Sequence, residues 1–228
     1  MSVNGCNHLN NIELQGIGMT SQRVRDRMVM RLREQGIRDD AVLAVMSKTP
    51  RHIFVDDALS SRAYDDDALP IGYAQTISAP SSVALMTQAL LAKGNVKKVL
   101  EVGTGSGYQA AILAQLVDKV YSVERISALQ DRARERYRLM SLTNVQLMHS
   151  DGSWGWPTYA PYDAIIVTAA PEQVPEGLLE QLAVGGVMII PVGGDKQALL
   201  CIEHTSEGFV ETVLDDARFV PMLQGKIV

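Results

Sequence analysis

Three closely spaced glycines form the most chemically informative stretch of the sequence. They follow the short apolar run Val99–Val102, and a helical pattern begins directly after them. Glycine lets the backbone turn sharply and approach a ligand without interference from a Cβ atom. The N-terminus of the following helix directs N–H groups and a positive dipole end toward a ligand held there. The sequence therefore predicts a ligand-binding loop made of Gly103, Thr104, Gly105, Ser106 and Gly107.

The spacing of these glycines separates the possible ligand classes. The dinucleotide-binding pattern G-x-G-x-x-G would place its last glycine at position 108, where this chain has Tyr108. Its ring would crowd the contact between helix and strand that a glycine permits. A Walker loop is excluded more firmly, because no Gly-Lys-Ser/Thr sequence follows. The G-x-G-x-G spacing, preceded by the acid Glu101, instead resembles the first motif of class I S-adenosylmethionine-dependent methyltransferases.

Two further acids lie where the next two apolar runs end. Glu124 comes about 20 residues after the loop, where an acid in nucleoside-binding folds accepts hydrogen bonds from ribose hydroxyls. A surface carboxylate paired with the neighbouring Arg125 is the alternative. Asp151 and Gly152 follow the third run, and a plain Asp-Gly turn is the alternative there. Together with Glu101 and Arg125, which we also predict to contact the cofactor, these residues predict an adenosyl ligand across the carboxyl ends of three strands. NAD shares that geometry, but the loop spacing favours S-adenosylmethionine.

From Lys97 onward, short β-rich runs alternate with helical patterns. Strands are predicted at Val99–Val102, Val120–Val123, Val145–Met148, Ala164–Val167 and Val187–Val192. Helices are predicted between them at Tyr108–Leu116, Ala128–Met140 and Glu176–Leu182. This alternation predicts an α/β fold with a doubly wound, Rossmann-like sheet that is mostly parallel. A last pair of strands, Leu199–Glu203 and Phe209–Leu214, predicts an antiparallel C-terminal hairpin.

The residues before this core are expected to form an N-terminal helical and loop extension. We expect a disordered leader over residues 1–18, a helical and substrate-loop region over 19–92, and the S-adenosylmethionine-binding core over 93–228. Helical patterns run from Met19 to about Gly36, from Asp39 or Asp40 to Ser47, and from Pro80 to Leu91. The stretch between Pro50 and Pro80 is expected to be a long loop, and a loop of that length suggests function.

Composition excludes several classes of protein. The 228 residues carry a formal net charge of -5, which argues weakly against a dedicated nucleic-acid partner. Two cysteines exclude a disulfide scaffold or a four-thiolate zinc site and favour the cytoplasm. No apolar run reaches the roughly 18 residues of a membrane span, and we find no secretory signal. Asp65-Asp66-Asp67 is interpreted as a solvated turn, so no metal site is expected.

A second set of residues lies in the long loop before the core. The stretch Ala68–Gly72, followed by Gln75-Thr76-Ile77-Ser78, resembles that of the bacterial protein-L-isoaspartate O-methyltransferase family. On the residues alone, Ser78 could simply cap the helix that begins near Pro80. The resemblance continues through further segments and covers the chain from Met19 onward: Glu101–Tyr108, Ser122–Arg125, Asp163–Ala170, Pro191–Gly193 and Arg218–Pro221.

The resemblance implies methyl transfer from S-adenosylmethionine to the free carboxylate of L-isoaspartyl residues in damaged proteins. It implies that Ser78 is the active-site residue and that Gln75, Thr76 and Ile77 contact the cofactor. Ser81 and Ser82 stand where bacterial relatives commonly have Tyr-Met, so a large group at the peptide site is missing. The alternatives are a methyltransferase for a small molecule or RNA, a NAD-dependent oxidoreductase, and a protein that binds S-adenosylmethionine without activity.

Overall fold

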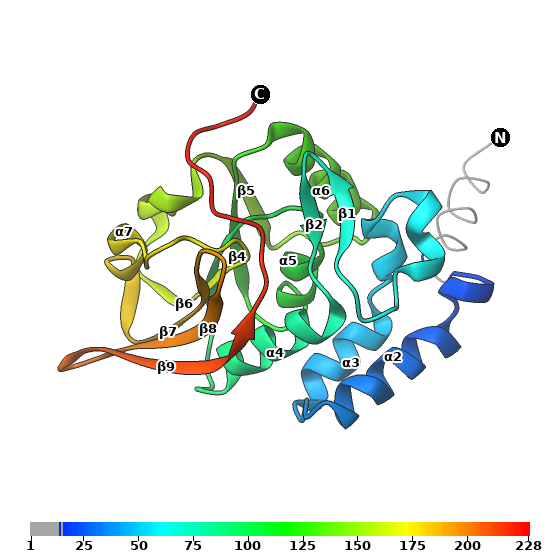
Figure 1. The fold of residues 1–228 in the computed structure, drawn as a ribbon, viewed down its shortest axis with the longest axis horizontal. Helices are drawn as coiled ribbons and strands as arrows, with labels where there is room; N and C mark the ends of the chain where they lie inside the picture. Colours follow the sequence, from blue (N-terminus) through cyan, green and yellow to red (C-terminus); the bar gives the residue numbers. More distant parts are fainter. Residues whose placement is uncertain (1–13, 15) are drawn as a thin grey trace.

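The computed structural model describes Leu14 and residues 16–228 (Figure 1). The leader predicted for residues 1–18 lies largely outside the described residues. Within the described part, the first element is the 3-10 turn η1 (Gly18–Thr20), which leads into α2 (Gln22–Glu34). The helix predicted from Met19 to about Gly36 therefore begins later, at Gln22, because Ser21 is extended, with ψ of 163°, and separates it from η1.

The core is a sheet of seven strands in the order β5-β4-β3-β6-β7-β8-β9. The first five strands of this order pair in parallel, whereas β8 and β9 are antiparallel to their neighbours. This arrangement confirms the predicted Rossmann-like sheet and its C-terminal hairpin. The strands span β3 (Lys98–Val102), β4 (Lys119–Glu124), β5 (Val145–His149), β6 (Tyr162–Val167), β7 (Leu182–Gly193), β8 (Gln197–Thr205) and β9 (Gly208–Ala217).

Both faces of the sheet are buried, because alternate residues of each central strand point to opposite sides. Ile166 and Ile189 pack in one apolar cluster with α4 (Pro80–Leu91), α5 (Tyr108–Leu113) and α6 (Ser127–Leu139). Their neighbours Ile165 and Ile190 pack in a second cluster with Leu178 of α7 (Glu176–Leu179). Figure 1 shows these helices on the two sides of the sheet.

Two predicted helices are longer than the helices in the structure. The helix predicted over Tyr108–Leu116 ends at Leu113, and turns follow it. The helix predicted over Glu176–Leu182 is the single turn α7, and β7 already begins at Leu182. Leu182 pairs with Tyr162 at the start of the parallel β6–β7 ladder, so sheet pairing overrides the local helical pattern there.

The prediction of a long loop between Pro50 and Pro80 is wrong, because the stretch contains regular secondary structure. It contains two 3-10 helices, η2 (Arg51–Phe54) and η3 (Asp57–Arg62), and an antiparallel hairpin of β1 (Leu69–Gly72) and β2 (Gln75–Ile77). The turn of this hairpin places Tyr73 and Ala74 at φ of 55° each. Neither residue type is typical of such a turn, so the sequence pattern does not predict the hairpin.

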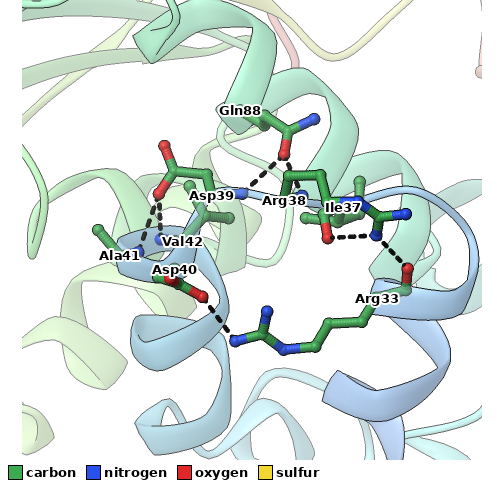
Figure 2. A network of polar contacts seen from close by, with 8 residues as sticks. All are labelled: Arg33, Ile37, Arg38, Asp39, Asp40, Ala41, Val42 and Gln88. Atoms are coloured by element: carbon green, nitrogen blue, oxygen red, sulfur yellow. Dashed lines mark hydrogen bonds and ion pairs between the residues drawn. The ribbon is translucent and has the colours of Figure 1, made fainter.

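The N-terminal helices pack together and against α4. Helix α2 contacts α3 (Asp40–Lys48), and both contact α4. Figure 2 shows the polar contacts at the corner between α2 and α3. Gln88 of α4 accepts hydrogen bonds through Oε1 from the backbone N–H groups of Arg38 (2.6 Å) and Asp39 (2.9 Å). The corner is thereby fixed to the helix that follows the Ser78 segment.

Asp39 caps α3, and its removal should reduce stability. Its carboxylate accepts hydrogen bonds from the N–H groups of Ala41 and Val42. We expect Asp39→Ala to lower the free energy of unfolding by about 1 kcal/mol, measured by urea denaturation. The control is Asp40→Ala, which removes only an exposed ion pair with Arg33 and should have little effect. Equal losses in both variants would contradict the cap assignment.

Candidate active site

A cavity lies at the carboxyl ends of the central parallel strands. Val102 of β3 is in register with Val123 of β4 and with Val167 of β6. The residues that follow these strands therefore leave the sheet side by side. The cavity receives predicted site residues from several segments: Gln75, Thr76, Ile77, Ser78, Gly103, Thr104, Gly105, Ser106, Glu124, Arg125 and Gly152.

The glycine loop presents backbone to this cavity at Gly105. Gly105 has φ of 52°, and a Cβ added there would meet only Ile71 Cδ1 at 3.6 Å. Its neighbour Gly107 has a different role, because a Cβ there would come within 2.8 Å of the Tyr137 hydroxyl and 2.9 Å of Ala133. Gly107 therefore permits close packing between α5 and α6, and it does not line the cavity.

Glu124 is the acid that the structure brings to the cavity. It is 5% exposed, and its carboxylate accepts hydrogen bonds from the N–H groups of Gly105 (2.8 Å) and Ile126 (2.9 Å). Burial raises the pKa of Glu124, while these hydrogen bonds act to lower it. Each carboxylate oxygen has a second lone pair, so the group can still accept hydroxyl protons from a ligand.

Arg125 takes no part in an ion pair with Glu124. Its guanidinium donates hydrogen bonds to the carbonyl oxygens of Gln224 and Gly225 in the C-terminal segment. The alternative of a surface Glu-Arg pair is therefore wrong for these two residues within the described structure. Arg125 borders the cavity and at the same time binds the last residues of the chain.

Glu101 lies beneath the glycine loop and does not line the cavity. Its side chain is fully buried and accepts a hydrogen bond from the Ser122 hydroxyl, which in turn bonds to the Thr104 hydroxyl at 2.6 Å. Burial raises the pKa of Glu101 to about 8 despite the bond from Ser122. Glu101 is therefore mostly protonated at neutral pH. Its contact with the ligand stays a prediction, and the structure shows a support for the loop.

Asp151 holds the C-terminal segment and likewise does not line the cavity. Its carboxylate accepts hydrogen bonds from Ser153 and from the N–H of Gly225. Burial acts to raise the pKa of Asp151, but these hydrogen bonds outweigh it and leave the pKa lowered. The next residue, Gly152, does border the cavity. The two neighbours therefore contribute in different ways.

The C-terminal segment after β9 completes the cavity wall, and reasoning from strand ends missed it. The segment runs along the carboxyl edge of the sheet (Figure 1), with bridges from Pro221 to Ala170 and from Ile227 to Ile126. Val220–Leu223 line the cavity. Other lining residues that we did not predict are Val83, Val102, Tyr108, Gln109, Val123, Thr168 and Ala169. Thr168 and Ala169 directly follow β6, so the rule that ligands bind at strand ends could have found them.

Ser78 lies between this cavity and a second one. The second cavity is bordered by the start of α4, including Ser81 and Ser82, and by residues 215–220. Four residues border both cavities: Thr76, Ser78, Thr168 and Val220. The N-cap residue of α4 is Ala79. The N–H of Ser81, in the first turn of α4, donates a hydrogen bond to the Asp66 carboxylate at 2.8 Å. The alternative that Ser78 is only a helix cap is therefore wrong.

Membrane-spanning helices and clusters of metal ligands were sought among the described residues. None of the helices there is long and apolar enough to cross a membrane. In the same part of the chain, no group of three or more His, Cys, Asp or Glu side chains could hold a metal ion. Asp65 and Asp67 are exposed, as expected for a solvated turn, whereas Asp66 is half-buried against α4.

The parallel sheet, its strand order and the cavity beside the glycine loop define a Rossmann-like protein of the class I methyltransferase type. The profile of the family described as protein-L-isoaspartate(D-aspartate) O-methyltransferase (PCMT) matches residues 22–227. The chain belongs to this family.

Curated relatives and solved structures agree with this assignment. A protein-L-isoaspartate O-methyltransferase of Cellvibrio japonicus is 55% identical over 221 residues, covering 95% of this chain and 99% of the relative. One of Pseudomonas aeruginosa is 58% identical over 210 residues, covering 92% and 100%. A solved protein-L-isoaspartate O-methyltransferase superposes with a TM-score of 0.79 at 27% identity over 86% of this chain and 65% of its own. A Plasmodium falciparum member of the family, solved in complex with S-adenosyl-L-homocysteine, superposes with a TM-score of 0.77 at 26% identity. The match covers 87% of this chain and 98% of that chain.

The different surroundings of two glycines allow a test of the cavity. A valine at Gly105 adds methyl groups on the side of the cavity, so we expect Gly105→Val to lose detectable binding of S-adenosyl-L-homocysteine in calorimetry. The matched control is Gly94→Val, where φ is 68° and nothing lies within 4 Å. Both variants carry similar backbone strain of about 1–2 kcal/mol. Normal affinity in a folded Gly105→Val protein would remove this loop from the binding site.

The raised pKa of Glu101 predicts a pH dependence of stability. Between its unfolded value of 4.5 and about 8, the folded state holds a proton that the unfolded state has released. The free energy of unfolding therefore falls as pH rises through this window. Glu101→Gln removes the titrating group and should flatten the decline, measured by urea denaturation at several pH values. An unchanged slope would mean that Glu101 is ionised in the folded protein.

Proposed function

We propose that this chain transfers a methyl group from S-adenosylmethionine to the free carboxylate of L-isoaspartyl residues in damaged proteins, which initiates their repair. Membership of the family supports this reaction. The observation in the structure that supports it best is the position of Ser78. A methyl group must pass from a donor to a carboxylate held next to it, and Ser78 borders both adjoining cavities.

The first cavity has the chemistry that S-adenosylmethionine needs. The Glu124 carboxylate suits ribose hydroxyl groups as hydrogen-bond donors. Gly105 leaves room for close approach of a ligand to the backbone. We assign Gln75, Thr76 and Ile77 to the same ligand from the side of the hairpin. When bound, S-adenosylmethionine supplies a methyl group on a positively charged sulfur, and the product is S-adenosylhomocysteine.

The residues of the site position the reactants and exclude water. A carboxylate with an ordinary pKa of about 4 is already ionised at neutral pH, so the attack requires no general base. Negative and positive charges combine in the transition state, and catalysis then comes mainly from alignment. Ser78 would donate a hydrogen bond to the carboxylate and orient it. The second cavity, with Ser81 and Ser82 in its wall, would receive the neighbouring part of the damaged protein.

The composition of the chain bears on its partner and its location. We propose a protein or peptide carrying isoaspartate as the partner, with no nucleic acid, because the net charge is -5. We also propose a cytoplasmic location, which the low cysteine count favours. The Ser81-Ser82 pair leaves a methyltransferase for another substrate as the competing reading, since this pair lies on the substrate side of Ser78.

Methyl transfer to two matched peptides tests the proposal. The first contains one L-isoaspartyl residue, and the second is the same peptide with a normal aspartyl residue. With radiolabelled S-adenosylmethionine, we expect label only in the isoaspartyl peptide. Binding of S-adenosylhomocysteine without transfer to either peptide would point instead to a different substrate or to a binding protein without activity.

Ser78→Ala tests the assignment of the catalytic residue. We expect turnover of the isoaspartyl peptide to fall by one to two orders of magnitude, about 1.4–2.7 kcal/mol, because the carboxylate loses its orienting hydrogen bond. The affinity for S-adenosylhomocysteine and the thermal midpoint should change little, since Ala79 and not Ser78 occupies the cap position of α4. A variant with a lower thermal midpoint and an unchanged single-turnover rate would remove Ser78 from the chemistry.

A further inference from the structure

Arg51 is a buried arginine that connects the segments around the proposed substrate site. It begins η2, and its side chain is fully buried. Its Nε donates a hydrogen bond to the carbonyl of Ala63 at 2.7 Å, and its Nη2 donates one to the carbonyl of Ser78 at 2.7 Å. These two carbonyls lie before and after the β1–β2 hairpin. One planar guanidinium therefore fixes the backbone on both sides of the hairpin.

The burial of this cation is costly. Within the described residues, the ion pairs of the protein involve other side chains, and none includes Arg51. Burial lowers the pKa of Arg51 to about 10, against the effect of Tyr108, Tyr64 and Asp66, so the group stays charged at neutral pH. An apolar side chain of similar volume would avoid this desolvation cost, but it could not donate hydrogen bonds to the carbonyls of Ala63 and Ser78. Packing alone therefore gives no reason for an arginine here.

The same guanidinium also contacts the cofactor side of the site. Its central carbon lies 4.8 Å from the centroid of the Tyr108 ring. Tyr108 is the first residue of α5, directly after the glycine loop, and it lines the first cavity. A guanidinium over an aromatic ring is attracted to it. Arg51 thus joins the Ser78 backbone to the element that carries the glycine loop.

We propose that Arg51 is a positioning residue for the methyl transfer, because it holds the Ser78 backbone at a fixed place relative to Tyr108 and the glycine loop. The inference rests on the proposed function, since the reaction provides the readout. In-line transfer depends strongly on alignment, and a misplacement of about 1 Å can cost roughly 100-fold in rate. Arg51 borders neither cavity, so it acts through Ser78.

Arg136 provides a matched comparison on the other loop. Its Nη1 donates a hydrogen bond to the carbonyl of Ser106 at 2.8 Å, and its guanidinium lies 5.7 Å from the centroid of Phe54. It is thus also an arginine that holds a loop carbonyl beside an aromatic ring. Ser106, however, belongs to the glycine loop that lines the first cavity. Loss of Arg136 should affect cofactor binding, whereas loss of Arg51 should affect the catalytic step.

The experiment compares Arg51→Lys and Arg51→Ala with wild type in single-turnover and steady-state assays on the isoaspartyl peptide. Lysine keeps the charge but reaches only one of the two carbonyls, so we expect about a tenfold loss of kcat. Alanine should lose about 100-fold. The dissociation constant of S-adenosylhomocysteine, measured by calorimetry, should stay within threefold of wild type. In Arg136→Lys, the dissociation constant of S-adenosylhomocysteine should rise by a larger factor than that by which kcat falls.

Two controls separate positioning from a general loss of stability. Leu43→Ala in α3 removes a fully buried side chain that borders neither cavity, and it should lower the thermal midpoint with no change in kcat well below that midpoint. In Arg51→Ala, added methylguanidinium should restore part of kcat, whereas methylammonium should not. If Arg51→Ala does not fold, Arg51→Lys and its kcat carry the test.

The outcomes distinguish this inference from the function on which it rests. Wild type that transfers no methyl group to the isoaspartyl peptide contradicts the proposed function. Active wild type with kcat unchanged in a folded Arg51→Lys protein overturns the role of Arg51 and leaves the function intact. The role of Arg51 is also overturned if Leu43→Ala, at the same thermal midpoint, loses as much kcat as the Arg51 variant. The loss of stability alone would then explain the loss of kcat.

Discussion

The hydrogen bond from Gly105 to Glu124 is the contact on which the cofactor side of the site depends. It joins the loop after β3 to the last residue of β4 across 19 positions of sequence. The parallel register brings the two strand ends level, and the carboxylate then fixes the loop with Gly105 facing the cavity. The Glu124 side chain is buried where it makes this contact. The remaining lone pairs of its carboxylate are the acceptors that a ribose would use. One carboxylate therefore shapes the loop and recognises the ligand.

The other side of the site is held by the N-terminal region. The core sheet alone would leave the glycine loop open, because Ser78 and the hairpin before it come from outside the sheet. Asp66 ties the start of α4, and Arg51 ties Ser78, so both ends of this short stretch are anchored by buried or half-buried polar groups. The anchors use backbone atoms of the site segment. Neither anchor uses the hydroxyl of Ser78.

The sequence sufficed for those features that local physical chemistry determines. The strand, glycine loop and helix around Gly105 carry their own signals, and Glu124 follows from strand-end geometry; the structure confirms this architecture and places both residues at the cavity. Glu101, Gly107 and Asp151 share the same motifs but face inward or toward the C-terminal segment. Their orientation depends on partners such as Ser122, Tyr137 and Gly225, which lie 21, 30 and 74 residues away. Such partners are set by tertiary packing, and a motif does not reveal them.

The charges around the site follow from the reaction that we propose. The substrate brings a carboxylate, and an ionised Glu101 beneath the glycine loop would add a buried negative charge close to the carboxyl group of Glu124. Burial avoids this by keeping Glu101 protonated at neutral pH, since its pKa is raised to about 8. Arg51 is the buried cation on the Ser78 side, and its pKa of about 10 keeps it charged. Glu124 would then accept hydrogen bonds from the ligand on one side of the site, and Arg51 would hold the Ser78 backbone on the other. The buried polar groups would then be a requirement of the chemistry that folding has to accommodate.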